Sequence, residues 1–295
     1  MLKTRILTAL VLIPLLLAAL FWLPNSMIAV LFGAIIAIGA WEWGTLTGFR
    51  GGQRIAYAAS IMVLGVLAVT PIVILVLGQM PVTVLLINFG VVLVFWLATL
   101  ISLIRDRADS FLFRSVPGRA LSGFFVLVPA WQAAVLLHAQ GHDLPAWSLQ
   151  VLDLHAWPAL LVFLFLLVWG ADTFAYFAGH RFGRHKLAPT VSPGKTIEGV
   201  IGGMLAVLLL AVLGGLYIWK LQGMQWLWWV LLCLAVGLIS VLGDLVESKV
   251  KRVAGVKDSG SIVPGHGGVL DRIDALTSAA PAFAFGTLLL DRVWS

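Results

Sequence analysis

Residues Gly243 to Asp274 read GDLVESKVKRVAGVKDSGSIVPGHGGVLDRID, and this charged stretch stands out from an otherwise apolar chain. It holds five of the 13 acidic residues of the protein, together with five lysines and arginines and His266. Such a concentration of charge needs a physical reason, because ionised side chains are costly near a bilayer. We therefore interpret the rest of the chain as a scaffold that holds this stretch at a membrane surface.

The composition predicts an all-α polytopic membrane protein. Hydrophobic residues make up 61% of the chain and charged residues 11%, with a mean hydropathy of +1.05, whereas about a quarter of the residues of a soluble protein are charged. The apolar runs are continuous rather than alternating, which argues against membrane-spanning strands. The single cysteine, Cys233, excludes an intrachain disulfide and is expected to be a small buried side chain.

Apolar runs of about 20 residues, the length that crosses a hydrocarbon core, predict nine transmembrane helices. They cover residues 6–23, 27–46, 55–77, 82–104, 120–138, 157–178, 200–219, 226–242 and 275–290. The first run could pass for a signal peptide, but bulky Phe21 and Trp22 stand where small residues would precede cleavage, so we interpret it as a span. We divide one continuous membrane domain into an N-terminal part, residues 1–119, and a C-terminal catalytic half, residues 120–295.

The distribution of basic residues predicts the orientation. With the amino terminus in the cytoplasm, seventeen of the 19 lysines and arginines fall in cytoplasmic segments, and Lys220 and Arg292 are the exceptions. This asymmetry agrees with the positive-inside rule and places the carboxyl terminus on the outer, periplasmic side. It also accounts for the net charge of +6 without nucleic acid as a partner.

Charged and polar positions on two predicted helices together predict a site for phosphates. If the eighth span stays helical beyond the interface, Asp244, Ser248 and Lys251 share one face at i, i+4 and i+7. Asp271 and Asp274, spaced i and i+3, share a face at the start of the ninth span. The glycines between these helices let backbone N–H groups approach an anion. Carboxylates, cations and a flexible turn together suit phosphates bound to Mg²⁺.

Structural alternatives exist for several of these residues. Asp271 and Asp274 could simply complement the dipole at the start of the last helix, and Glu247 with Lys251 could be a surface ion pair. The basic loop at residues 180–199 could be an interfacial anchor. Within it, VSPGKT lacks the full spacing of a phosphate-binding loop and is a weak motif alone.

Asp172 and Asp244 are harder to explain structurally, since an ionised carboxylate within or beside a bilayer costs a few kcal/mol unless it is compensated. We favour a pocket that they share with cations or a metal. A buried neutral acid is one alternative. A secondary transporter that uses both as coupling-ion sites is the main non-enzyme alternative, although the sequence shows no internal repeat.

The stretch from Ser248 to Asp274 closely resembles the signature of phosphatidate cytidylyltransferases, also called CDP-diacylglycerol synthases. That pattern has Ser, then Lys-Arg, Lys-Asp, Pro-Gly-His-Gly-Gly and Asp-Arg-x-Asp at the spacings found here. ADTFAYFAG at 171–179, GRHKLAPTVSPGKTIEG at 183–199 and the dipeptide Gly243-Asp244 also resemble blocks of this family. The likeness covers residues 171 to about 280, while the earlier spans match in hydropathy and length.

The resemblance implies an enzyme of the bacterial cytoplasmic (inner) membrane whose active site faces the cytoplasm. It would join CTP to phosphatidic acid with Mg²⁺, and with a second cation in some cases, giving CDP-diacylglycerol and pyrophosphate; the family is also expected to form homodimers. A CTP-dependent lipid kinase shares much of this chemistry but would release CDP.

Carried over by position, the resemblance implies metal ligands at Asp244 and Asp271 and a catalytic set of these two with Lys251 and Asp274. The expected substrate-binding residues are Asp172, Ser192, Lys195, Thr196, Ser248, Arg252, Lys257, Asp258, His266 and Arg272. For His266, a proton shuttle and a hydrogen bond that stabilises the turn are equally acceptable roles.

Overall fold

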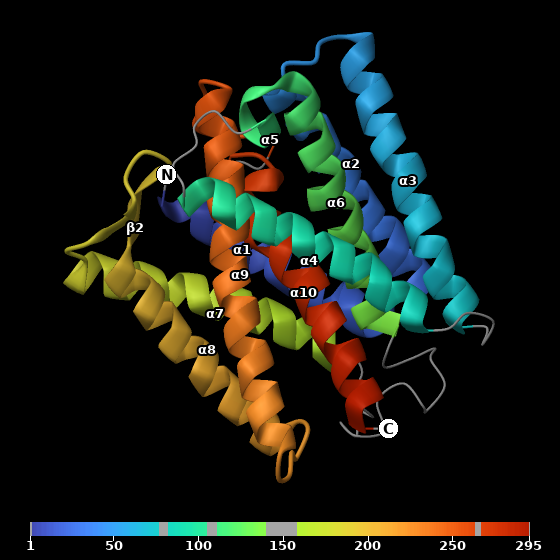
Figure 1. Cartoon of the computed structure of the whole chain (residues 1–295), viewed down its shortest axis with the longest axis vertical. Coiled ribbons are helices and arrows are strands. Elements are labelled where there is room, and N and C mark those ends of the chain that lie inside the picture. The colour runs from blue at the N-terminus through green and yellow to red at the C-terminus, as the bar shows by residue number, and fades with distance from the viewer. Residues whose placement is uncertain (1, 77–81, 105–110, 140–157, 263–266, 295) are drawn as a thin grey trace.

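The structure is a computed structural model that describes residues 2–76, 82–104, 111–139, 158–262 and 267–294. The described residues form a bundle of helices with one short hairpin (Figure 1). The elements are α1 (Leu2–Trp22), α2 (Asn25–Thr47), α3 (Gly52–Val76), α4 (Val82–Ile104), α5 (Phe111–Arg114), α6 (Val116–Ala139), α7 (Ala159–Phe182), β1 (Lys186–Ala188), β2 (Ser192–Thr196), α8 (Ile197–Tyr217), α9 (Gln225–Val253) and α10 (Leu270–Trp294).

Eight of these helices are long and apolar enough to cross a membrane, judged over the described residues by length and composition. They are α2, α3, α4, α6, α7, α8, α9 and α10. In α1 the apolar segment runs from Leu10 to Trp22, which is shorter than a full span. The all-α membrane architecture is therefore confirmed, whereas the count of nine spans stays a prediction.

The centre of the bundle is formed by α6 and α10. In each of these helices 72% of the most apolar window is buried, compared with 22% for α3 and 33% for α4. The outer helices expose large apolar side chains such as Val63 and Val94. In water this surface would be unfavourable, but it suits contact with lipid chains. Cys233 is buried, as predicted.

Hydrogen bonds at both ends of α2 and α6 show that these helices are antiparallel. At one end, Trp43 Nε1 donates to the carbonyl oxygen of Arg119 over 2.8 Å. At the other end, Asn25 Oδ1 and His138 Nδ1 lie 2.9 Å apart. The first of these ends also holds the carboxyl end of α9 and the amino end of α10, and the hairpin between α7 and α8 reaches toward it (Figure 1). We call it the charged end.

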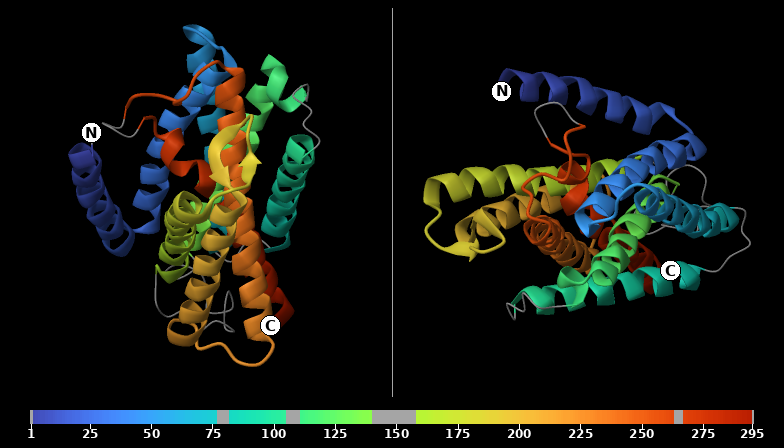
Figure 2. Two further views of the ribbon diagram at one scale, coloured as in Figure 1. Left: turned by 90° about the vertical axis from the view of Figure 1, so that its left-hand side faces the viewer. Right: turned by 90° about the horizontal axis from the view of Figure 1, so that it is seen from above.

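The basic loop contains a hairpin that the sequence did not predict. Strands β1 and β2 pair antiparallel, with Lys186 opposite Thr196 and Ala188 opposite Ser192. The hairpin lies against the carboxyl-terminal part of α9 (Figure 2). VSPGKT is thus mostly strand rather than a glycine-rich turn, and Thr196 ends the strand by accepting a hydrogen bond from Gly199 N over 3.1 Å at the start of α8.

Close packing of α7 against α8 fixes the position of this hairpin. A Cβ atom at Gly203 would lie 2.8 Å from the carbonyl oxygen of Ala171, and one at Gly202 would overlap the side chain of Ala178. These two glycines therefore permit close contact between the helices. The contact holds Asp172, on α7, near the strand that precedes α8.

Candidate active site

The charged face predicted for α9 is present. The helix continues to Val253, so Asp244, Ser248 and Lys251 lie on one side of it. Ser248 Oγ donates a hydrogen bond to Asp244 Oδ1 over 3.1 Å. The periodicity argument from the sequence is therefore correct for this helix.

An ion pair joins this face to the hairpin. Lys195 Nζ, from β2, lies 2.6 Å from Asp244 Oδ2, and the two side chains are 23% and 27% exposed. Asp172 of α7 lies within electrostatic range of both. Arg252 of α9 donates to the carbonyl oxygen of Val191 over 3.3 Å and fixes the hairpin further. Residues predicted from three separate segments thus meet at one partly accessible place.

A second ion pair lies deeper in the bundle and centres on Lys251. Its Nζ is 2.6 Å from Asp271 Oδ1 of α10 and 3.2 Å from Glu247 Oε2 of α9. All three side chains are at most 10% exposed. The interpretation of Glu247 and Lys251 as a surface pair is therefore wrong: the pair exists, but it is buried between two helices.

Two carboxyl groups face each other beside this lysine. Glu247 and Asp274 lie within hydrogen-bonding distance of one another. Glu247 Oε1 is buried and receives no hydrogen bond from an amine, amide or hydroxyl of the described residues. Asp274 is also within electrostatic range of Asp244. Two acids in contact require a shared proton or a cation between them.

Asp271 organises the loop before α10. Its Oδ2 accepts hydrogen bonds from Ser259 N at 3.0 Å, Ser259 Oγ at 3.1 Å and Gly268 N at 2.8 Å. Gly267 has φ of +85°, and a Cβ there would lie 2.6 Å from the same oxygen. The loop can close around the carboxylate because this position is glycine. Asp271 does more than complement the helix dipole.

Glu42, on α2, completes this arrangement, and the sequence interpretation missed it. The side chain is 3% exposed and accepts hydrogen bonds from Ser259 Oγ at 3.0 Å, Val269 N at 3.0 Å and Leu270 N at 2.8 Å. The sequence does carry a signal: an acid stands between Trp41 and Trp43 in an apolar span, where an uncompensated carboxylate is expensive.

Of the other predicted residues, three charged side chains lie at the rim of the charged end. Lys257, Asp258 and Arg272 are exposed, while Ser192 is half-buried on β2. Thr196 is buried at the junction of β2 and α8. His266 lies outside the described residues. The substrate contacts assigned to all of these stay predictions.

The donor set fits Mg²⁺ provided that substrate phosphates complete the coordination. Among the described residues, no three acidic, histidine or cysteine side chains form a metal-binding group on their own. Magnesium is usually held by one or two carboxylates, phosphate oxygens and water. The buried Glu247 Oε1, which lacks a donor, and the accessible Asp244 show that the acids here outnumber their cations. Asp271, with four donors in place, would exchange one of them to bind an ion.

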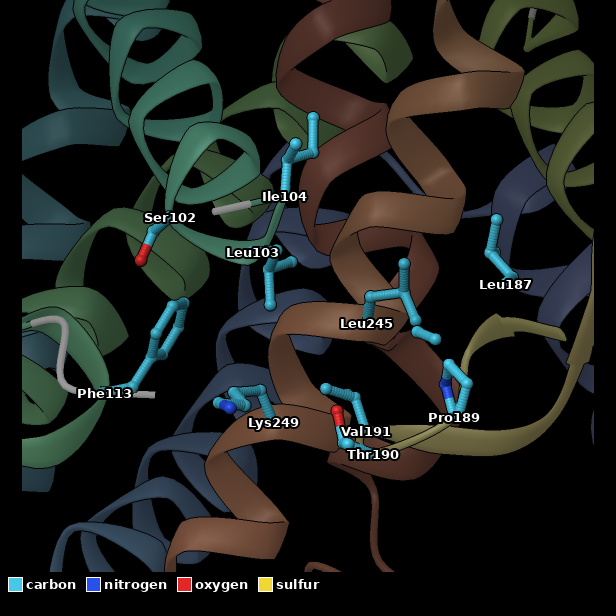
Figure 3. A pocket seen from close by; sticks show the side chains of 11 residues that line it. Ser102, Leu103, Ile104, Phe113, Leu187, Pro189, Thr190, Val191, Leu245 and Lys249 are labelled. Atoms are coloured by element: carbon cyan, nitrogen blue, oxygen red, sulfur yellow. The ribbon is translucent and has the colours of Figure 1, made fainter. Parts of the chain in front are cut away.

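A cavity of about 390 Å³ lies close to these residues. It is bounded by the end of α4, Phe113 of α5, the turn of the hairpin and α9. Figure 3 shows Lys249 extending toward Phe113, with Pro189 and Val191 on the hairpin side. None of the predicted site residues lines it, so we treat it as separate from the acid and lysine cluster.

Comparison with known proteins extends the similarity beyond the charged end. The cytidylyltransferase family model matches residues 3–290. The chain is 43% identical to a phosphatidate cytidylyltransferase of Pseudomonas aeruginosa, over 96% of each chain. It is 39% identical to one of Haemophilus influenzae, over 97% of this chain and 98% of the other. A Brucella abortus relative of the same name is 45% identical over 55% of this chain and 58% of its own.

Proposed function

Because the chain belongs to the cytidylyltransferase family and is therefore a nucleotidyltransferase, we propose that it transfers CMP from CTP to phosphatidic acid. An oxygen of the lipid phosphate attacks the α-phosphorus of CTP. The bond from that phosphorus to the bridging oxygen of the β-phosphate breaks, and pyrophosphate leaves. The products are CDP-diacylglycerol and pyrophosphate.

The observation that carries this proposal is the convergence of Asp172, Lys195, Asp244, Lys251 and Asp271 from four separate elements. No protein nucleophile is needed, because the phosphate monoester supplies its own anion. The task of the protein is electrostatic: it must bring two polyanions together and stabilise the charge that develops on the leaving group.

Each lysine has a distinct part in this scheme. Lys195 is accessible and can exchange Asp244 for a phosphate oxygen as substrate enters. Lys251 is buried and holds Asp271 and Glu247 in place. Exposed Arg252 and Lys257 add positive charge at the rim, where the triphosphate of CTP would approach from water.

Asp244 and Asp271 are the residues we expect to hold Mg²⁺, with Asp172, Glu247 and Asp274 contributing negative charge nearby. When bound, the ion would neutralise charge on the triphosphate and on the leaving pyrophosphate.

The charged end suits a substrate that lies partly in the membrane. Phosphatidic acid keeps its acyl chains in the bilayer and its phosphate at the interface, while CTP arrives from the cytosol. The basic residues of the hairpin and of α9 gather at this end of an integral membrane protein. The positive-inside rule favours the cytoplasmic side of the inner membrane for it.

The position of a radioactive label in the products tests the reaction. The purified protein is incubated with phosphatidic acid, Mg²⁺ and CTP carrying ³²P at either the α or the γ position. We expect the α label in the lipid and the γ label in pyrophosphate. Transfer of the γ label to the lipid with release of CDP would identify a lipid kinase. The absence of labelled lipid with both labelled forms of CTP would contradict the proposal.

A further inference from the structure

We propose that Glu42 of α2 is a positioning residue for the transfer reaction, because it holds the loop before α10 in the position that the reaction requires. This inference rests on the function proposed above. Glu42 does not reach substrate itself, since its side chain is 3% exposed and the loop encloses it. It acts through the residues that it holds.

The surroundings of the Glu42 carboxylate consist of hydrogen-bond donors from this loop and from the first residue of α10. Oε1 accepts from Val269 N, and Oε2 accepts from Leu270 N and Ser259 Oγ. A Cβ atom at Gly268 would lie 2.6 Å from both carboxylate oxygens, so the backbone approaches the acid as closely as glycine allows. One side chain from the N-terminal part thus holds the loop both at Ser259 and at Val269, just before α10.

Ser259 connects Glu42 to the catalytic cluster. Its hydroxyl lies 3.0 Å from Glu42 Oε2 and 3.1 Å from Asp271 Oδ2, and its backbone N–H donates to Asp271. Asp271 in turn binds Lys251 over 2.6 Å. A chain of contacts therefore runs from α2 through the loop to α10 and α9. Displacing Glu42 would shift the serine, and with it the carboxylate that we expect to bind Mg²⁺.

The same loop carries exposed Lys257 and Asp258 immediately before Ser259. Holding Ser259 determines where these two side chains stand at the rim. A misplacement of about 1 Å in a catalytic arrangement can cost on the order of 100-fold in rate. The N-terminal part of the chain, which has no predicted catalytic residue, thereby gains a defined role in the site.

Glu42→Gln is the sharpest test, because it keeps the size of the side chain. An amide has one acceptor oxygen, so its NH₂ group must face a donor. We expect faster hydrogen exchange in peptides that cover 255–262 and 267–272, with other helices unchanged. We also expect kcat to fall roughly 10- to 100-fold while KM for CTP changes less than about threefold.

Ser259→Ala breaks the same bridge from the loop side and replaces Glu42→Gln if that variant does not fold. In the double variant the loss of kcat should be clearly smaller than the product of the two single losses, because both changes remove one interaction. Asp291→Asn is the matched control. Asp291 is also a buried acid, at the opposite end of α10, and its replacement should leave loop exchange and kcat unchanged.

Unchanged exchange in the loop of Glu42→Gln would overturn the inference, and so would wild-type kcat. Faster exchange throughout the protein would overturn it too, by reducing Glu42 to a general role in folding. Failure of the proposed function is distinguishable from these outcomes. In that case the wild-type protein makes no CDP-lipid, yet the exchange experiment still decides whether Glu42 holds the loop.

Discussion

At the scale of single residues, the site contains two lysines in different environments. Lys195 pairs with Asp244 at a partly exposed position, and Lys251 pairs with Asp271 and Glu247 in the interior. An exposed pair is worth little to stability, whereas breaking a buried pair is expensive. We therefore assign the accessible lysine to substrate and the buried lysine to the architecture of the site.

Lys195→Gln tests this assignment. We expect the variant to fold normally and to lose about 100-fold in CDP-diacylglycerol formation, because one fixed positive charge near the phosphates is missing. The measurement is the initial rate together with the thermal unfolding midpoint. Lys220→Gln, outside the charged end, should behave like the wild type, and equal rates for both variants would argue against a phosphate contact at Lys195.

The residues that could be predicted from the sequence are those related by helical spacing. Asp244, Ser248 and Lys251 follow from the period of one helix, Asp172 follows from the cost of an acid within an apolar span, and Lys195 came from the resemblance. Glu42 and Glu247 were missed for different reasons. Glu247 has a lysine four residues later, which looks like an ordinary surface pair, and Glu42 is more than 200 residues away from its partners.

At the scale of elements, the long helices were predictable because each contains a continuous apolar run, and α9 extends beyond its apolar part as expected. The hairpin was not predictable, because its strands have three and five residues and no alternating pattern. Contacts with α9 fix its position, and such long-range contacts leave no local trace in the sequence.

Gly203→Val tests whether the packing of α7 against α8 supports the hairpin. The valine would meet the backbone of α7 beside Ala171, so we expect a loss of about 1–3 kcal/mol in stability and reduced CDP-diacylglycerol formation. Thermal unfolding and the rate assay measure the two effects. Leu209→Ala, on the exposed face of the same helix, is the control and should change neither. A stable, fully active Gly203→Val would show that the close contact is dispensable.

At the scale of the whole molecule, the N-terminal part and the catalytic half form a joint structure at the charged end. Glu42 of the N-terminal part accepts hydrogen bonds from the backbone N–H groups of Val269 and Leu270 in the catalytic half. The boundary at residue 119 came from the pattern of spans and remains a prediction. Contacts across the bundle cannot be seen in hydropathy, which reports where helices lie but not how they meet.

The predicted orientation can be tested with single cysteines. Cys233 is buried, so the wild-type protein should give little background with a membrane-impermeant maleimide. In intact spheroplasts Lys220→Cys should react at once, whereas Lys257→Cys should react only after the membrane is opened, because we expect the charged end to face the cytoplasm. Immediate labelling of Lys257→Cys in sealed spheroplasts would reverse the topology.

The central claim is that the acids of the charged end enable the transfer of CMP to a lipid phosphate with Mg²⁺. Its most direct measurement is the rate of CDP-diacylglycerol formation by the wild type and by Asp244→Asn at saturating Mg²⁺, CTP and phosphatidic acid. We predict an active wild type and a variant that folds but is slower by about 100-fold or more. A folded Asp244→Asn that keeps most of the wild-type rate would contradict the account.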